Sequence, residues 1–134
     1  ESVYKTLASG NSKLICVLGA AGGGRDKWKR PELGKVASQH CKEIVLTSED
    51  PDDEDSRQIM SEIGAGISNF KPPFLKIIDR REAIHKALRD ARPGDTVIIT
   101  GKGCEPSICL AGGKQMPWDD RQVVREEFAK IHAR

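Results

Sequence analysis

Short apolar runs alternate with amphipathic segments along most of the chain, and this alternation constrains the fold more than any other feature. The first run, Leu14–Leu18, is uninterrupted and ends at a glycine, which is typical of a strand that is buried on both faces. Further apolar runs predict strands at 44–46, 75–78 and 96–100. Apolar side chains at helical spacing predict helices at 31–41, 59–67, 79–91 and 119–131.

Strands and helices that alternate in this way form βαβ units around a parallel sheet. The predicted fold class is therefore α/β, a Rossmann-like three-layer sandwich whose mostly parallel sheet has about six strands. Gly112 and Gly113 predict a hairpin turn between two brief extended pieces, so we expect one antiparallel edge strand. Residues 14–134 are expected to form one domain, and residues 1–13, which are polar and show no core pattern, a linker from an upstream region.

The composition fits a globular domain and argues against several classes of function. The chain has 134 residues, of which 37% are hydrophobic and 31% charged. The 22 basic and 20 acidic side chains give a net charge of +2, so we expect no nucleic-acid partner. No apolar run approaches the roughly 18 residues of a membrane span, and no signal peptide is visible, so we expect no membrane partner and a cytoplasmic location. The 4 cysteines and 3 histidines lack metal-ligand spacing, so we expect no metal site of that kind.

The first candidate site is the glycine-rich, basic segment after the first predicted strand, Gly19–Pro31. Its glycines let the backbone approach an anion closely, and the N-terminus of the following helix favours negative charge. Gly19 and Gly24 have the spacing of a P-loop, but Arg25 and Asp26 stand where a lysine and a serine or threonine are needed. We expect a phosphate or carboxylate here, and a solvated surface loop is the alternative.

Two further loops follow predicted strands. The acidic loop at 47–55 could bind a cation or a substrate ammonium, or its carboxylates could simply stabilise the start of the next helix. The loop at 101–105 holds a lysine between two glycines, which indicates close approach of the backbone to a ligand. Cys104 in this loop could act as a nucleophile, but no histidine lies near it in the sequence, and an ordinary thiol is the simpler interpretation.

Four motifs in this order resemble the C-terminal domain of the Mur ligase family, closest to its UDP-N-acetylmuramoyl-tripeptide synthetase type, over about residues 14–130. The first is G-G-x-R-D-x-x-K-R-P at Gly22–Pro31, and the second is a loop like D-N-P-R at 47–52. The third is D-R-x-x-A-I at Asp79–Ile84. The fourth is a G-K-G-H-E-like loop at 101–105, followed by a D-D-R helix start at 119–121.

The resemblance implies an ATP-dependent amide ligase of peptidoglycan synthesis. ATP phosphorylates the terminal carboxylate of a UDP-N-acetylmuramoyl dipeptide, and the amine of the incoming third amino acid attacks the acyl phosphate. ATP and Mg²⁺ would bind mainly in an upstream central domain, so the isolated domain would be inactive and carry no catalytic residue. It would close over the site and hold the amino acid, which excludes water from a reactive intermediate.

The resemblance also assigns binding residues. Arg25, Gly101 and Glu105 match positions that hold the amino acid, and a guanidinium suits a carboxylate as a carboxylate suits an ammonium. With the acidic loop included, the expected amino-acid-binding set is Arg25, Glu49, Asp50, Asp52, Gly101 and Glu105. The expected phosphate contacts are the basic side chains Lys27, Lys29 and Arg30.

Two positions depart from the family pattern. The arginine of D-N-P-R, which would pair with the distal carboxylate of diaminopimelate, is replaced by Asp52. We therefore expect a substrate side chain that ends in a cation, such as lysine or ornithine, facing Asp50 or Asp52. Cys104 stands where the family has a histidine, and no role is carried over to it.

Two other functions stay open at the level of sequence. One is a related ligase that adds glutamate or builds another polyamide. The other is a stand-alone phosphate-binding or RNA-binding module that uses residues 25–30, with Trp28 for stacking. The nearby carboxylates and the net charge of +2 disfavour RNA.

Overall fold

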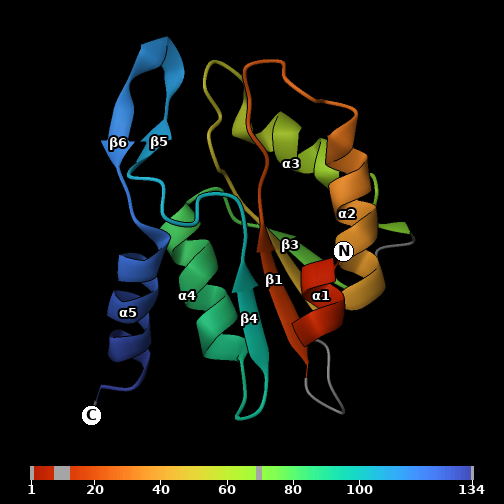
Figure 1. Ribbon diagram of the computed structural model, residues 1–134, viewed down its shortest axis with the longest axis vertical. Coiled ribbons are helices and arrows are strands. Elements are labelled where there is room, and N and C mark those ends of the chain that lie inside the picture. The colour runs from red at the N-terminus through yellow and green to blue at the C-terminus, as the bar shows by residue number, and fades with distance from the viewer. Residues whose placement is uncertain (1, 8–12, 69–70, 134) are drawn as a thin grey trace.

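The computed structural model describes residues 2–7, 13–68 and 71–133. Its centre is a parallel sheet of 4 strands in the order β3-β2-β1-β4 (Figure 1). These strands are β1 (Leu14–Leu18), β2 (Glu43–Leu46), β3 (Phe74–Lys76) and β4 (Thr96–Ile99). The α-helices are α1 (Ser2–Leu7), α2 (Lys29–His40), α3 (Ser56–Gly64), α4 (Arg80–Asp90) and α5 (Asp120–Ile131).

The side chains of β1 alternate between two cores, one on each face of the sheet. Leu14, Cys16 and Leu18 pack in the core formed with α1, α2 and α3. Ile15 and Val17 pack in the core formed with α4 and α5. All five side chains are at most 3% exposed, so β1 is buried on both faces, as its uninterrupted apolar run predicts. The three-layer α/β fold class is confirmed (Figure 1).

Two further strands form a separate hairpin. β5 (Ser107–Cys109) pairs antiparallel with β6 (Gln115–Pro117), and a short 3-10 turn at Ala111–Gly113 joins them. We expected about six strands in one sheet with an antiparallel edge strand. The part of the chain that the structure describes corrects that detail, because β5 buries only Ile108 and β6 is exposed throughout. Neither strand has the apolar faces that a place in a sheet covered on both sides requires.

The N-terminal segment contributes to the core. Tyr4 of α1 is 8% exposed, and its hydroxyl oxygen lies 3.1 Å from the sulfur of Cys16. Tyr4 of segment 1–13 thus belongs to the core, although the segment shows no apolar pattern in the sequence. Residues 1 and 8–12 lie outside the described residues, and the role of the segment as a linker stays a prediction. None of the helices in the described part of the chain has the length and apolar character needed to cross a membrane.

Candidate functional site

The carboxyl ends of β1 and β4 mark the point where the connections of the sheet diverge. β1 lies between β2 and β4, and the chain reaches these two neighbours over opposite faces of the sheet. Ligands of open α/β sheets bind at such points. A cavity of about 330 Å³ lies there, which we call the switch-point cavity. The segments around this end of the sheet are the glycine loop (19–28), the acidic loop (47–55) and the lysine loop (100–106).

Three of the expected amino-acid-binding residues, Arg25, Glu49 and Gly101, line this cavity. Arg25 is exposed and, among the described residues, makes no hydrogen bond or ion pair. Glu49 is half-buried, and burial raises the pKa of its carboxyl group; Asp50 acts in the same direction, whereas the positive charge of Arg80 opposes it. The cavity therefore presents an open guanidinium and an open carboxylate to the same space.

Gly101 brings the backbone of the lysine loop against Glu49. Its φ is +109°, a conformation that side-chain-bearing residues rarely adopt. A Cβ atom at this position would also lie 2.7 Å from Oε2 of Glu49. Both observations explain why a glycine follows β4, and the absence of a side chain leaves the Glu49 carboxylate room beside the loop.

The glycine loop and the acidic loop are in direct contact. The N–H of Gly22 donates a hydrogen bond of 2.6 Å to the carbonyl oxygen of Asp50, and the N–H of Gly24 donates to the carboxylate of Glu54. A Cβ atom at Gly22 would lie 1.9 Å from the carbonyl oxygen of Pro51. Only glycine fits this approach, which places the basic loop against the acidic one.

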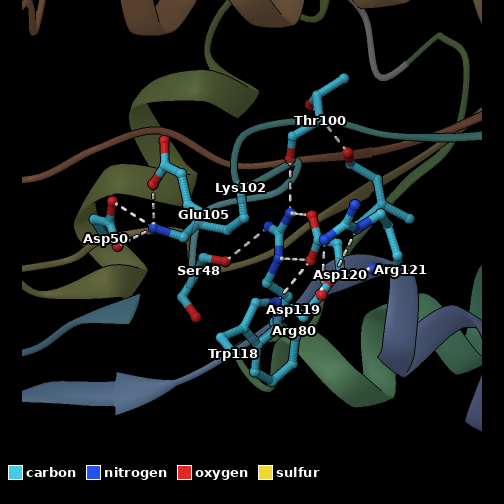
Figure 2. A network of polar contacts seen from close by, with 11 residues as sticks. Ser48, Asp50, Arg80, Thr100, Lys102, Glu105, Trp118, Asp119, Asp120 and Arg121 are labelled. Atoms are coloured by element: carbon cyan, nitrogen blue, oxygen red, sulfur yellow. Dashed lines mark hydrogen bonds and ion pairs between the residues drawn. The ribbon is translucent and has the colours of Figure 1, made fainter. Parts of the chain in front are cut away.

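Two other expected binding residues, Asp50 and Glu105, bind an internal cation. The ammonium of Lys102 donates to the two carboxylate oxygens of Asp50 at 2.7 and 2.8 Å and to Oε2 of Glu105 at 2.6 Å (Figure 2). The Lys102 side chain is 1% exposed. Burial alone would lower the pKa of its ammonium, but the hydrogen bonds to Asp50 and Glu105 outweigh burial and raise the pKa. Lys102 therefore stays charged in the folded protein.

Asp52 lies outside the residues that line the switch-point cavity. It adopts a φ of +55°, and its N–H donates a hydrogen bond of 3.1 Å to the carbonyl oxygen of Cys109 in the hairpin. Its carboxylate points toward Gly23 of the glycine loop, where a Cβ atom would lie 3.1 Å from Oδ2. The structure therefore places Asp52 between the glycine loop and the hairpin.

The three expected phosphate contacts differ in accessibility. Lys27 and Lys29 are exposed. The ammonium of Lys29 lies 3.0 Å from a carboxylate oxygen of Asp26 and 5.5 Å from the ring centre of Trp28, a side chain that is itself 70% exposed. Both ammonium groups are therefore accessible from solvent, and Lys29, unlike Lys27, lines the switch-point cavity.

Arg30 has a structural role instead. It is 1% exposed, and its guanidinium donates to Glu54 at 2.9 Å, to Glu62 at 2.5 Å and to the carbonyl oxygen of Ala21 at 2.9 Å. Its hydrogen bonds lower the pKa of the carboxyl groups of Glu54 and Glu62. Because α2 turns this side chain inward to α3 and the acidic loop, Arg30 is not available as a surface contact for phosphate.

Sequence reasoning missed the buried network around Arg80. Nε and Nη2 of Arg80 donate to the two carboxylate oxygens of Asp120 at 2.9 and 2.8 Å (Figure 2). The same guanidinium donates to the carbonyl oxygens of Ser48 at 3.2 Å and Thr100 at 2.8 Å, and Trp118 Nε1 donates to Asp120 at 2.7 Å. Arg80 thus fixes the first residues of the acidic and lysine loops. The sequence signals for this network are the D-R motif, which contains Arg80, and the D-D-R motif, which contains Asp120. Both motifs indicate helix starts, but neither shows that these two side chains form a pair.

Cys104 is exposed and lines a separate cavity of about 510 Å³. Arg121 and Asp119 line it too, but no histidine is among its lining residues, so none there could serve as the base of a cysteine nucleophile. Nothing in this geometry distinguishes Cys104 from an ordinary surface thiol.

Comparison with known proteins gives consistent matches. A family model described as "Mur ligase, glutamate ligase domain" matches residues 1–103. Two curated relatives carry the name UDP-N-acetylmuramoyl-L-alanyl-D-glutamate--2,6-diaminopimelate ligase. The one from Nitrosomonas europaea is 42% identical over 124 residues, which are 92% of this chain and 23% of the relative. The one from Synechocystis sp. is 46% identical over 114 residues, which are 85% of this chain and 22% of the relative.

The fold is also similar to that of a protein with this name. A solved structure of a protein with that name superposes with a TM-score of 0.88 at 34% identity, covering 99% of this chain and 27% of the other. The chain therefore spans about a quarter of the length of the relatives it matches.

Proposed function

Since the chain belongs to the Mur ligase family, we propose that it is the C-terminal domain of an ATP-dependent ligase that adds the third amino acid to a UDP-N-acetylmuramoyl dipeptide in peptidoglycan synthesis. One observation carries the proposal most directly. Arg25 and Glu49 face the switch-point cavity, and neither makes a hydrogen bond or ion pair within the described residues. A guanidinium and a carboxylate in one cavity match the carboxylate and ammonium of a free amino acid.

The proposed reaction has two steps. ATP transfers its terminal phosphoryl group to the carboxylate of the dipeptide, and the amine of the bound amino acid then attacks the acyl phosphate, with inorganic phosphate as the leaving group. We place the ATP site and most Mg²⁺ ligands in a central domain upstream of this chain. Within the described residues, no group of three or more metal-ligating side chains is arranged to hold an ion.

The chain's own residues bind and position the amino acid in this proposal. Arg25 binds its α-carboxylate, while Glu49 and Glu105 lie on the side of its ammonium. The exposed ammonium groups of Lys27 and Lys29 fit a phosphate of the nucleotide, whereas the guanidinium of Arg30, which is buried and bound to Glu54 and Glu62, does not. Closure of this domain over the upstream site excludes water from the acyl phosphate. Alone, the domain binds the amino acid weakly and has no ligase activity.

We further propose that the amino acid carries a second cation, as lysine and ornithine do. Glu49 lines the cavity without a polar partner in the described part of the chain, and Glu105 of the lysine loop is more than half exposed. Of the basic side chains that line the cavity, Arg25 is the one without a partner among the described residues. Asp52 stands where diaminopimelate-adding enzymes of the family have an arginine. The curated relatives from Nitrosomonas europaea and Synechocystis sp. are named for diaminopimelate. A comparison of lysine, ornithine and diaminopimelate as substrates therefore tests whether the acidic loop changes the preferred amino acid.

The full-length protein tests the function. It is incubated with ATP and UDP-N-acetylmuramoyl-L-alanyl-D-glutamate together with lysine, ornithine, diaminopimelate or glutamate, one at a time, and the amide product is measured by mass spectrometry. We expect product and ADP with a diamino acid, and more with lysine or ornithine than with diaminopimelate. More product with diaminopimelate would refute the second-cation proposal alone. Product with glutamate only, or none at all, would refute the function.

A further inference from the structure

Lys102 lies at the junction of the glycine loop, the acidic loop, the lysine loop and the hairpin. Its ammonium binds Asp50 and Glu105. Asp50 in turn accepts a hydrogen bond of 2.8 Å from the N–H of Cys109 through Oδ1, and its carbonyl oxygen accepts one from Gly22. The buried ammonium therefore joins the acidic loop to the lysine loop (Figure 2), and Asp50 extends this connection to the glycine loop and the hairpin.

The backbone of the lysine loop is shaped to turn this side chain inward. Gly101 and Gly103, on either side of Lys102, have φ values of +109° and +53°. The N–H of Glu105 donates a hydrogen bond of 2.8 Å to the carbonyl oxygen of Lys102, which closes the turn. The turn places the start of the Glu105 side chain beside the buried ammonium.

Glu105 and Asp50 differ in their remaining capacity to accept hydrogen bonds. Asp50 receives hydrogen bonds on both carboxylate oxygens, so it has little capacity left for a substrate. Glu105 is 56% exposed and is bound through Oε2, while its Oε1 accepts no hydrogen bond from the described residues. A flexible exposed carboxylate is thereby held by one oxygen and open at the other.

We infer that Lys102 is a positioning residue: its ammonium holds the Glu105 carboxylate so that Oε1 can accept a hydrogen bond from the amine of the incoming amino acid. The inference rests on the proposed function. Asp50 is then the structural counter-ion that keeps Lys102 in place and connects it to the glycine loop and the hairpin. The alternative is that Lys102 serves only to neutralise Asp50.

The substitution Lys102→Met in the full-length protein tests this role, because methionine keeps most of the buried aliphatic volume and removes the ammonium. We expect the KM for the amino acid to rise by at least about tenfold, with kcat and the KM for ATP changed less than about threefold. Lys76→Met, the same substitution at an exposed lysine outside the site, is the matched control and leaves all three constants unchanged. An unchanged KM for the amino acid in a folded Lys102→Met protein would overturn the inference.

The double variant Asp50→Asn/Lys102→Met separates the two roles of the lysine and restores charge balance if the single variant fails to fold. If Lys102 positions Glu105, the double variant folds and its KM for the amino acid stays high. A return of that KM to the wild-type value would show that Lys102 only neutralises Asp50, and the inference would be wrong.

Hydrogen–deuterium exchange of the full-length protein gives a readout that does not need activity. Loss of the ammonium removes two of the three hydrogen bonds to the Asp50 carboxylate, so we expect exchange in residues 101–110 to rise about tenfold or more in Lys102→Met, with β2 unchanged. An inactive wild-type protein would refute the proposed function, and the exchange data would still decide on Lys102. Unchanged exchange in this segment would show that the lysine does not fix these loops.

Discussion

Arg25 and Glu49 are charged side chains that line the switch-point cavity and lack polar partners among the described residues, whereas Asp26, Lys29 and Arg30 in the same lining are paired. A charged side chain that has no partner within the protein is either solvated by water or paired with a ligand. The neighbouring carboxylates show how strongly the surroundings decide a role, because Asp50 is saturated by a buried lysine although it is adjacent to Glu49 in the chain.

Arg25→Ala in the full-length protein should weaken amino-acid binding. A charge-assisted hydrogen bond contributes about 1.5–3 kcal/mol, so we expect the KM for the amino acid to rise roughly 10- to 100-fold. Steady-state kinetics measures the effect, and Arg57→Ala, at an exposed arginine of α3, is the control. A KM that changes equally in both variants would remove Arg25 from the site.

Glu127 gives a prediction about pH. Hydrogen bonds from Arg81 and Lys130 and the nearby Nδ1 of His85 lower the pKa of its carboxyl group from 4.5 to about 2. A lowered pKa in the folded state stabilises the fold above the ordinary pKa, and this stabilisation is lost as the pH falls through the folded-state value. We expect Glu127→Gln to be less stable than wild type at neutral pH, and the difference to shrink between pH 4.5 and about 2. Urea unfolding over a pH series measures this, and a pH-independent difference would contradict the assignment.

At the scale of elements, α4 and α5 are joined to the loops of the site by the pair Arg80–Asp120. The Arg80 side chain is 1% exposed and that of Asp120 is 6% exposed. The pair Arg121–Asp119, at the start of the same helix α5, is exposed, with side-chain exposures of 62% and 33%. The two pairs have similar chemistry and differ in burial.

Arg80→Met should therefore destabilise the protein far more than Arg121→Met. Removing one partner of a buried pair leaves an unpaired buried charge and costs about 3–5 kcal/mol, whereas an exposed pair contributes about 0–1 kcal/mol. Chemical denaturation of the two variants and wild type provides the comparison. Equal losses would mean that burial of Asp120 does not set the strength of this contact.

The close packing of α2 on α3 predicts whether a substitution at Gly34 raises or lowers the stability of the protein. Alanine in place of a glycine inside a helix normally stabilises it by about 1 kcal/mol. At Gly34, however, a Cβ atom would lie 2.0 Å from the carbonyl oxygen of Ile63 in α3. We expect Gly34→Ala to destabilise the protein by roughly 1–3 kcal/mol, since the helices must move apart. Thermal unfolding tests this, with Gln39→Ala on the exposed face of α2 as control; a stabilised Gly34→Ala protein would show that the contact is loose.

Apolar patterning predicted the strands that are buried on both faces and the helices that bury one long apolar stripe. β1, β2 and β4 lie where the runs indicated, and Asp79 begins α4 by accepting a hydrogen bond from the N–H of Glu82. Patterning was weaker at the margins of the sheet. The third strand lies at Phe74–Lys76 rather than 75–78, and the hairpin separates from the sheet, because these short segments bury few side chains.

For the whole molecule, the order of strands determines which loops meet, and sequence order alone does not show it. The fold class follows from the parallel βαβ pattern, and so does the position of the glycine, acidic and lysine loops at the same, carboxyl edge of the sheet. The burial of Arg30 and the pairing of Lys102 with Asp50 do not, because they depend on side-chain directions in loops with positive φ values. Charged residues in such loops resemble ligand contacts in the sequence whether they face solvent or the protein interior.

If the proposed function is right, the switch-point cavity holds the amino acid that the ligase adds. A ¹H–¹⁵N chemical-shift titration of this 134-residue chain with lysine, ornithine, diaminopimelate, glutamate and ADP locates the binding site residue by residue. We predict that one diamino acid shifts the amides of Arg25, Glu49 and Glu105 more than any others. If shifts with every amino acid were absent at these residues, or lay instead along α4 and the hairpin, the cavity would not be the amino-acid site.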